Sequence, residues 1–392
     1  MSGLRLALAD VILPGYEAGS SAQLSVDGIR PDPVGGAGCD MPLVAFPGLL
    51  NSHDHLDLAC HPPLVGERFE SDADWARALH RRHGALFAGL AKIPRPWRIA
   101  RGMLRNLLCG VTEVLDHQPP AAVVDPAMPL RRIGGFDFIH SPTFDSRWWA
   151  KMLRPGGGRP VVVHLGEGLD GQSAARARRL LRFNPWRRPV VAVHGLALDA
   201  RQIGGLRALV WCPTSNQALF GQTLSAAQTG AAPTLLFGTD SPLTGGKNIW
   251  RQLRHARRLG VVPESQLYQA ITGKAAAFWG LGRESAWPTD TVVLAQRRRD
   301  GFLDAFFDTG PDNIMLIIRK GRIVVADHAF AARFLPGLDT YQATEVAVGD
   351  SRKWVLWPEA PDFAALDSRL EALGLEYDHY NICYRLAAGT TR

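Results

Sequence analysis

Cysteines and long apolar segments are scarce in this sequence. The 392 residues include 5 cysteines, an odd number, and no two of them form a CxxC pair. Neither a disulfide framework nor a thiolate zinc site is indicated, so we expect reduced, structural cysteines. No apolar run approaches the roughly 20 residues that cross a bilayer, and the first residues, MSGLRLALADVILPG, lack the pattern of a signal peptide. The sequence predicts a cytoplasmic globular protein.

A concentrated charge of one sign is also missing. The 44 Lys and Arg residues against 37 Asp and Glu give a net charge of +7, and the positive residues are spread along the chain. Arginine-rich segments such as ALHRRH and ARARRLLRF have the pattern of solvated helix faces and do not indicate a nucleic-acid partner. We expect a small-molecule substrate and no nucleic-acid or membrane partner, while a homodimer stays open.

Apolar runs that alternate with helical segments fill the middle of the chain. The alternation predicts an α/β fold with a parallel sheet, and we expect a (β/α)8 TIM-like barrel over residues 47–283. Seven runs are visible, so the eighth strand is expected in 121–130. One helix is expected to begin at a Ser71 cap and another to end at Gly260. The runs are LVAFPGLLN, VTEVLDH, RRIGGFDFI, RPVVVHLG, RPVVAVHG, ALVWCPTS and APTLLFGTD.

Strand-like segments without intervening helices lie outside this region. They are LRLALADVILPG, DTVVLAQ and NIMLIIRKGRIVVAD. They predict a small β-sandwich built from both chain ends, residues 1–46 and 284–335. Residues 336–392 are expected to form a C-terminal extension with one helix and no motif that indicates a role.

Polar residues stand where the apolar runs end. His53 and His55 end the first run, His164 and His194 end the two RPVV runs, and Asp240 ends the last. Active sites of βα barrels are built at these strand ends. Residues i and i+2 of a strand point to the same side, so His53 and His55 can face one ion while the residue between them turns away. Imidazoles and a carboxylate are the ligands of a divalent metal such as Zn²⁺, with Fe²⁺ as the alternative.

Five motifs carry a resemblance to a known family. PGLLNSHDHL, HLGE, VHG, WCPTSN and FGTDSPLTGG occur in this order between residues 42 and 280. Together they resemble the amidohydrolase superfamily, specifically its cytosine deaminase, guanine deaminase and chlorohydrolase-like branch. The resemblance implies a barrel with an accessory sandwich.

The resemblance also implies roles for individual residues. It makes Glu167, three residues after His164, the group that shuttles a proton to the substrate. It makes His194 the group that orients the attacking water and the substrate. The residues that it implies as metal ligands are His53, His55, His164 and Asp240.

Metal chemistry gives the two carboxylates different tasks. A bound metal lowers the pKa of water from about 15.7 to roughly 7 and so makes hydroxide available at neutral pH. Asp240 would take the proton of that water, and Glu167 would supply one to a ring nitrogen or leaving group. Binuclear members of the superfamily bridge two metals with a carboxylated lysine. The single lysine between His117 and His164, Lys151, lies in a helix-and-loop pattern, so we expect one ion, Zn²⁺ before Fe²⁺.

Further polar residues lie near the predicted strand ends. Asn216 in CPTSN and Lys247 in TGGKN are expected on loops of the active face, where they either hold the substrate or are inert. His117 ends a strand and either approaches the site or is structural, and Cys212 is expected to be packed. The remaining histidines are expected to be structural: His61, His80, His83, His140, His255, His328 and His379.

These observations predict a metal-dependent hydrolase that deaminates a small nitrogen heterocycle through a metal-bound hydroxide. One alternative is an amidase or another C–N or C–Cl hydrolase that uses the same site. An alternative of another class is a catalytically inactive barrel that acts as a binding module. The joint presence of the implied ligands and proton-transfer groups favours an enzyme, since fold alone does not fix function.

Overall fold

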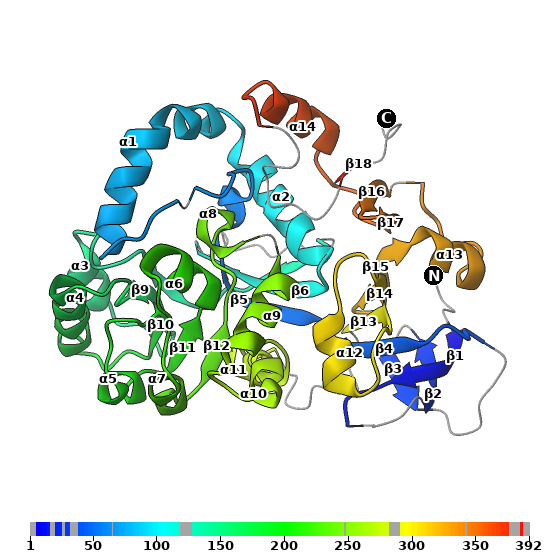
Figure 1. Cartoon of the computed structure of the whole chain (residues 1–392), viewed down its shortest axis with the longest axis horizontal. Helices are drawn as coiled ribbons and strands as arrows, with labels where there is room; N and C mark the ends of the chain where they lie inside the picture. The colour runs from blue at the N-terminus through cyan, green and yellow to red at the C-terminus, as the bar shows by residue number, and fades with distance from the viewer. Residues whose placement is uncertain are drawn as a thin grey trace.

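The structure is a computed structural model, shown in Figure 1. It describes residues 5–15, 20–25, 28–31, 38–64, 66–117, 128–246, 248–281, 291–341, 343–375 and 385–386. In Figure 1 the green strands and their helices lie on the left. A sheet built from the blue and the yellow-to-orange parts of the chain lies on the right.

Two parallel sheets form the part of the fold that carries the site. The first has five strands in the order β12 (Leu235–Phe237), β11 (Ala208–Trp211), β10 (Val190–His194), β9 (Val161–Leu165) and β8 (Asp137–Ile139). The second has three strands in the order β5 (Leu49–Asp54), β6 (Val111–Asp116) and β7 (Arg131–Arg132). The predicted α/β fold with parallel sheets is confirmed.

A third sheet joins both ends of the chain. Its ten strands run in the order β18 (Arg385–Leu386), β16 (Thr344–Val348), β17 (Ser351–Val355), β15 (Arg322–Asp327), β14 (Ile314–Arg319), β13 (Thr291–Gln296), β4 (Leu43–Pro47), β1 (Arg5–Ile12), β2 (Ser20–Ser25) and β3 (Gly28–Pro31). These strands form one sheet, and the two-layered sandwich stays a prediction.

Helices connect many of the strands, and α12 and α13 lie against strands of the ten-stranded sheet. They are η1 (Leu56–Leu58), α1 (Asp72–Ala91), α2 (Arg95–Leu107), α3 (Trp148–Met152), α4 (Gly171–Arg182), α5 (Ala200–Gly204), α6 (Pro213–Phe220), α7 (Ala226–Ala231), α8 (Pro242–Gly245), α9 (Ile249–Leu259), α10 (Glu264–Gln269), α11 (Gly273–Phe278), α12 (Phe302–Asp308), α13 (His328–Phe334) and α14 (Phe363–Glu371). Within the described ranges, no helix is both long and apolar enough to span a membrane.

Two helix ends follow the capping pattern of the sequence. The Ser71 hydroxyl accepts a hydrogen bond from the backbone N–H of Asp74 at 3.3 Å and so caps α1. Helix α9 ends at Gly260, whose φ of +64° is a left-handed conformation that glycine adopts without steric penalty. Both predicted helix ends are confirmed.

The two parallel sheets share one apolar core. Leu50 of β5 and Leu115 of β6 belong to the same buried cluster as Val162 of β9 and Val191 of β10. Every residue of β9 and β10 is buried. Burial on both faces explains why these strands appear in the sequence as unbroken apolar runs without polar alternation.

Strand β12 connects the two parallel sheets at β5. The carbonyl oxygen of His53 accepts hydrogen bonds from the backbone N–H groups of Thr239 at 2.9 Å and Asp240 at 3.0 Å. Parallel contacts therefore run from β8 through β12 to β5, β6 and β7. Among the described residues no pairing joins β7 to β8, so the closed barrel stays a prediction.

The prediction of a single strand in RRIGGFDFI was wrong. This segment contains both β7 and β8, because the chain bends between them at Gly135, which has a φ of +82°. The additional strand therefore comes from this run. The stretch 121–130 was expected to hold it; its residues 128–130 form no strand, and the rest lies outside the described residues.

The run LVAFPGLLN also contains two strands. Strands β4 and β5 belong to different sheets and are separated by Gly48, whose N–H donates to the carbonyl of Thr291 at 3.2 Å.

In the C-terminal region the predicted helix is present as α14, but β16 and β17 were not predicted. Buried and partly exposed residues alternate in these two strands, so they lack a continuous apolar run.

Candidate metal centre

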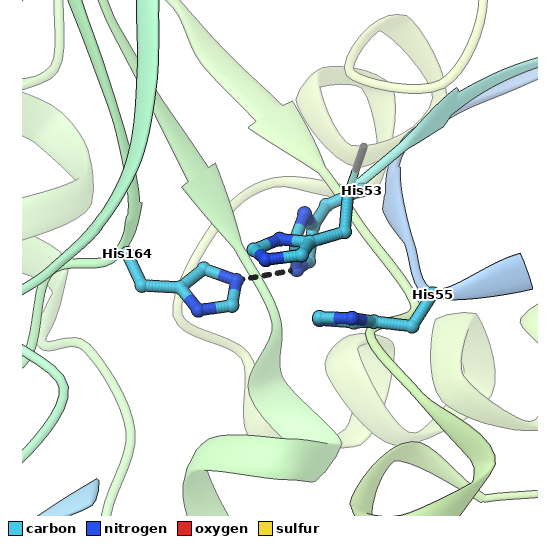
Figure 2. Close-up of side chains that lie close together, drawn as sticks. His53, His55 and His164 are labelled. Atoms are coloured by element: carbon cyan, nitrogen blue, oxygen red, sulfur yellow. Dashed lines mark hydrogen bonds between the residues drawn. The ribbon is translucent and has the colours of Figure 1, made fainter. Parts of the chain in front are cut away.

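Five residues of the predicted site lie at the carboxyl ends of four parallel strands. His53 lies near the end of β5 and His55 directly follows it, His164 is in β9, His194 is the last residue of β10, and Asp240 follows β12. Figure 2 shows the rings of the first three histidines directed toward one another. The structure therefore brings together residues that are 187 positions apart in the sequence, from 53 to 240.

The nitrogen and oxygen atoms of four of these residues converge. Nε2 of His53 lies 3.0 Å from Nε2 of His164, and Oδ1 of Asp240 lies 3.3 Å from Nε2 of His55 and 3.6 Å from Nε2 of His53. Zinc binds imidazole nitrogen at about 2.0–2.1 Å, so separations of this size suit donors that share one ion.

Burial keeps most of these imidazoles in the form that binds metal. It lowers the pKa of His53 to about 4 although Asp240 opposes the shift, and it lowers the pKa of His164 well below the ordinary value with help from neighbouring imidazoles. His55 is the exception: burial opposes its protonation, but the hydrogen bond to Asp240 and nearby negative charges raise its pKa. Burial disfavours ionisation of Asp240, but hydrogen bonds to His53 and His55 hold its pKa well below the usual range. Neutral imidazoles and an ionised carboxylate are the donor set of a zinc site. The residues present therefore fit a divalent metal.

The carboxylate of Asp240 is oriented by two hydroxyl groups. Ser215 donates to Oδ2 at 2.5 Å and Thr244 donates to the same oxygen at 3.0 Å. Oδ1 is the oxygen that faces the histidines. The hydroxyl groups thus fix which oxygen is presented to the site.

The residue between the two first histidines turns away, as predicted. Asp54 accepts hydrogen bonds from Nη2 of Arg105 at 2.8 Å and from Nδ2 of Asn106 at 2.7 Å, both on helix α2. Nδ2 of Asn51 also donates to Asp54, at 3.2 Å, and to the hydroxyl of Thr239, at 2.7 Å. This buried polar network holds β5 against β12 and so fixes the direction of the histidine pair.

A glycine allows β12 to approach β5 closely. A Cβ atom on Gly238 would lie 2.6 Å from Cβ of His53, a separation that two such atoms do not adopt. The next strand-end residue, Asp240, has a φ of +57°, and His194 has a φ of +73°. Non-glycine residues with positive φ carry strain, and such residues gather at functional sites.

Glu167 lies between two of the histidines. Its Oε2 is 3.6 Å from Nδ1 of His164, and its Oε1 is 3.6 Å from Nε2 of His194. Burial, together with the negative charges of Asp72 and Asp240, raises the pKa of Glu167 well above its ordinary value. The shift favours the protonated carboxyl group, which is the form that is able to donate a proton.

His194 is oriented by Asn216. Nδ1 of His194 lies 2.9 Å from Oδ1 of Asn216, and because that oxygen only accepts, Nδ1 carries the proton. Nε2 of His194 is buried without a hydrogen-bond partner and faces Glu167. The placement of Asn216 on a loop was wrong, because Pro213 starts helix α6 and carries Asn216 within it.

Two lysines and one cysteine were also named in the sequence analysis. Lys247 lies outside the described residues. Lys151 is on helix α3, as the sequence pattern predicts, and pairs with Asp145 at 2.7 Å. Cys212 is buried, and burial raises the pKa of its thiol well above the ordinary value, as expected of a packed residue.

Sequence reasoning missed several residues that support the site. The network around Asp54 is made by Asn51, Arg105 and Asn106. The position of Asn51, a polar residue within an apolar run, was the feature of the sequence that could have indicated a buried hydrogen-bonded role. His140 was expected to be structural, and its ring lies 4.7 Å from that of His117. No spacing rule brings β8 to β6, so this contact has no signature in the sequence.

Comparisons with known proteins give a likeness of fold. No protein-family model and no curated protein matches the chain. An adenosine deaminase from Xanthomonas campestris with bound zinc is 16% identical, with a TM-score of 0.64 over 94% of this chain and 97% of that one. An atrazine chlorohydrolase from Arthrobacter aurescens complexed with zinc is 15% identical, with a TM-score of 0.60 over 94% and 99%. The aminofutalosine deaminase of Helicobacter pylori is 12% identical, with a TM-score of 0.54 over 82% and 99%.

At these identities the likeness establishes a shared fold. It places the chain's architecture with deaminases and chlorohydrolases, two of which carry zinc. The narrower assignment to the cytosine and guanine deaminase branch stays a prediction.

Proposed function

We propose that this protein is a metal-dependent hydrolase that removes ammonia from a small nitrogen heterocycle. The observation that carries the proposal is the contrast between two carboxyl groups in one site. Hydrogen bonds to His53 and His55 hold the pKa of Asp240 well below its usual range. Burial and neighbouring negative charge raise the pKa of Glu167 well above its ordinary value. Two carboxyl groups whose pKa values are driven apart divide the base and acid roles.

Three imidazoles and one carboxylate hold the metal in this proposal. The ligands are His53, His55, His164 and Asp240, whose donor atoms converge. When bound there, a single Zn²⁺ would lower the pKa of water to about 7 and polarise the substrate. Zinc is proposed ahead of Fe²⁺ because two solved structures of the same fold carry zinc.

The chain's own residues supply the proton transfers. Asp240, ionised and oriented through Oδ2, accepts the proton of the attacking water. Glu167 donates its proton to the ring nitrogen or to the departing amine. His194, held by Asn216, presents an unpartnered Nε2 beside Glu167 and orients the reacting groups.

A screen of ammonia release tests this function. The zinc-loaded protein would be assayed against nucleobases, nucleosides, pterins and amino-triazines, with the chelated protein as the control. The proposal predicts release of ammonia from at least one heterocycle, which stops when zinc is removed. No ammonia from any heterocycle, with cleavage of amides or chlorinated rings instead, would establish the alternative hydrolase, which is favoured only by the fold shared with a chlorohydrolase.

The same screen separates an enzyme from a binding module. A module without activity would bind heterocycles, with a shift of the melting temperature, and turn over none of them.

We also propose that the partner is a small molecule, without nucleic acid or membrane, since the charged segments of the chain are dispersed.

A further inference from the structure

The strand beside the proposed ligand His164 carries aromatic side chains toward the metal centre. Phe138 of β8 lies opposite Val162 of β9. Because side chains two positions apart share a face of a strand, His140 and His164 lie on that same side of the sheet. The N–H of His164 donates to the carbonyl of His140 at 3.1 Å, and the centroids of the two rings are 5.5 Å apart. His140 therefore borders the metal centre on the side of β8.

Solvent reaches the inner side of this strand end. Ile139, which points to the other face of the sheet, is fully buried, whereas Phe138 and His140 are partly exposed. Phe138 packs against the apolar cluster that contains Val162, so its side chain is directed inward. Inward-facing side chains that keep exposed surface border space that a ligand is able to enter.

Phe144 continues this surface outward. Its ring packs edge-on against that of His140, with centroids 5.3 Å apart, and 45% of the residue is exposed. Its N–H donates to the hydroxyl of Ser141 at 3.2 Å, which holds the turn after β8. We call Phe138, His140 and Phe144 the aromatic wall. Exposed aromatic surface next to a functional site is typical of a contact surface for a ligand.

The charge near the aromatic wall is compensated. The ammonium group of Lys151 lies 5.6 Å from the centre of the Phe138 ring. The same group is paired with Asp145 at 2.7 Å. The wall therefore favours an apolar group over an ion of either sign.

We propose that the aromatic wall holds an apolar substituent of the substrate, such as an aromatic ring. The inference rests on the proposed function and names its substrate more closely. The amine-bearing carbon of the heterocycle lies at the metal, and the substituent extends past His140 to Phe144, one ring further from the ligands. Aromatic side chains bind such groups by burial and edge contacts, whereas a sugar would leave hydroxyl groups against the rings without partners.

A matched pair of imidazoles tests the inference without knowledge of the substrate. 4-Phenylimidazole and 4-methylimidazole both offer a ring nitrogen to zinc, but only the first carries a group long enough to reach the aromatic wall. We expect the zinc-loaded protein to bind 4-phenylimidazole at least about tenfold more tightly, as measured by isothermal titration calorimetry. In Phe144→Ala this preference should fall by about two- to tenfold, while the affinity for 4-methylimidazole stays unchanged.

Trp149→Ala is the matched control. Trp149 is exposed to a similar extent, 48%, but lies on helix α3 and outside the aromatic wall. We expect this variant to keep the full preference for 4-phenylimidazole. Both substitutions remove an exposed ring, so both variants should fold and keep their zinc.

The outcomes separate this inference from the proposed function. Equal binding of the two imidazoles, binding of neither, or an unchanged preference in Phe144→Ala would overturn the inference and leave the metal centre in place. An unaltered protein that holds no zinc would refute the proposed function itself. Failure of every heterocycle to release ammonia, with the preference for 4-phenylimidazole intact, would also refute that function and would support the aromatic wall as a contact surface for apolar groups.

Discussion

Asp240 and His194 adopt backbone conformations that most residues avoid. Their φ values are +57° and +73°, and only two other non-glycine residues in the described part of the chain have a positive φ. The strain at Asp240 is compensated by hydrogen bonds from its backbone N–H to His53 and from Ser215 to its carboxylate. Strain that the surrounding structure maintains in this way is typical of functional positions.

The sharpest prediction for a single residue concerns Glu167. Substitution Glu167→Gln keeps the size of the side chain and removes the proton that can be transferred. We expect kcat to fall by roughly 10² to 10⁴, the usual contribution of general acid–base catalysis, while zinc content stays at the unaltered value. Steady-state kinetics on the identified substrate, with elemental analysis of the same sample, would measure both. A variant that turns over within a few-fold of the unaltered enzyme would show that Glu167 is not the proton donor.

His194 should orient reacting groups without holding the metal. Its Nδ1 is bonded to Asn216 and its Nε2 faces Glu167. We expect His194→Asn to retain zinc and to slow turnover, because the residue acts beside the ligands. Metal content is the deciding measurement, and a loss as large as that of His53→Ala would place His194 among the ligands.

At the scale of elements, the close approach of β12 to β5 depends on Gly238. An added Cβ would meet His53 at 2.6 Å and Cγ1 of Val210 at 2.9 Å. We expect Gly238→Ala to separate the strands, to destabilise the protein by about 1–3 kcal/mol, and to weaken zinc binding. Urea unfolding and chelator competition would measure the two effects.

Gly230 provides the matched control for that substitution. It lies in helix α7, and an added Cβ would meet nothing within 4 Å. We expect Gly230→Ala to stabilise the protein by about 0.5–1 kcal/mol and to leave zinc binding unchanged. Equal stability and metal affinity in both variants would contradict the account of how the two strands meet.

The sequence predicts elements well where burial is continuous. Strands β9 and β10 are buried along their whole length and appear as apolar runs that end on His164 and His194. Strand β7 has only two residues, both partly exposed, so the sequence does not separate it from β8 in the same predicted run. The candidate ligands could be predicted because each ends a run of this kind.

The remaining parts of the site depend on contacts that the sequence does not contain. His117 also ends a run, but its stacking between His55 and His164 depends on how the ends of separate strands come together in the fold. Asn51 was hidden within an apolar run, and its bond to Thr239 joins residues 188 positions apart. Such partners become visible only when the strands are placed side by side.

At the scale of the whole molecule, buried histidines make stability depend on pH. His61 is buried, and burial, partly opposed by its hydrogen bond to the carbonyl of Leu58 at 3.2 Å, lowers its pKa to about 4. Its ordinary pKa is 6.5. The unfolded chain therefore binds a proton that the folded protein does not bind, and stability falls as the pH decreases from 6.5 toward 4.

The contribution of His61 can be separated by substitution. Between pH 7 and pH 5 we expect the free energy of unfolding to fall less in His61→Gln than in the unaltered protein, by about 2 kcal/mol. Urea unfolding of the chelated proteins at both pH values measures this difference. Equal pH dependence in the two proteins would show that His61 titrates in the folded state as it does in the unfolded chain.

The central claim is that one metal ion is held by residues at the ends of three parallel strands, β5, β9 and β12. Elemental analysis of purified protein, unaltered and with His53→Ala, tests it most directly. We predict about one equivalent of zinc per chain in the unaltered protein and its loss, together with activity, in the variant. Two equivalents in the active protein, or one equivalent retained by an active His53→Ala variant, would contradict the account.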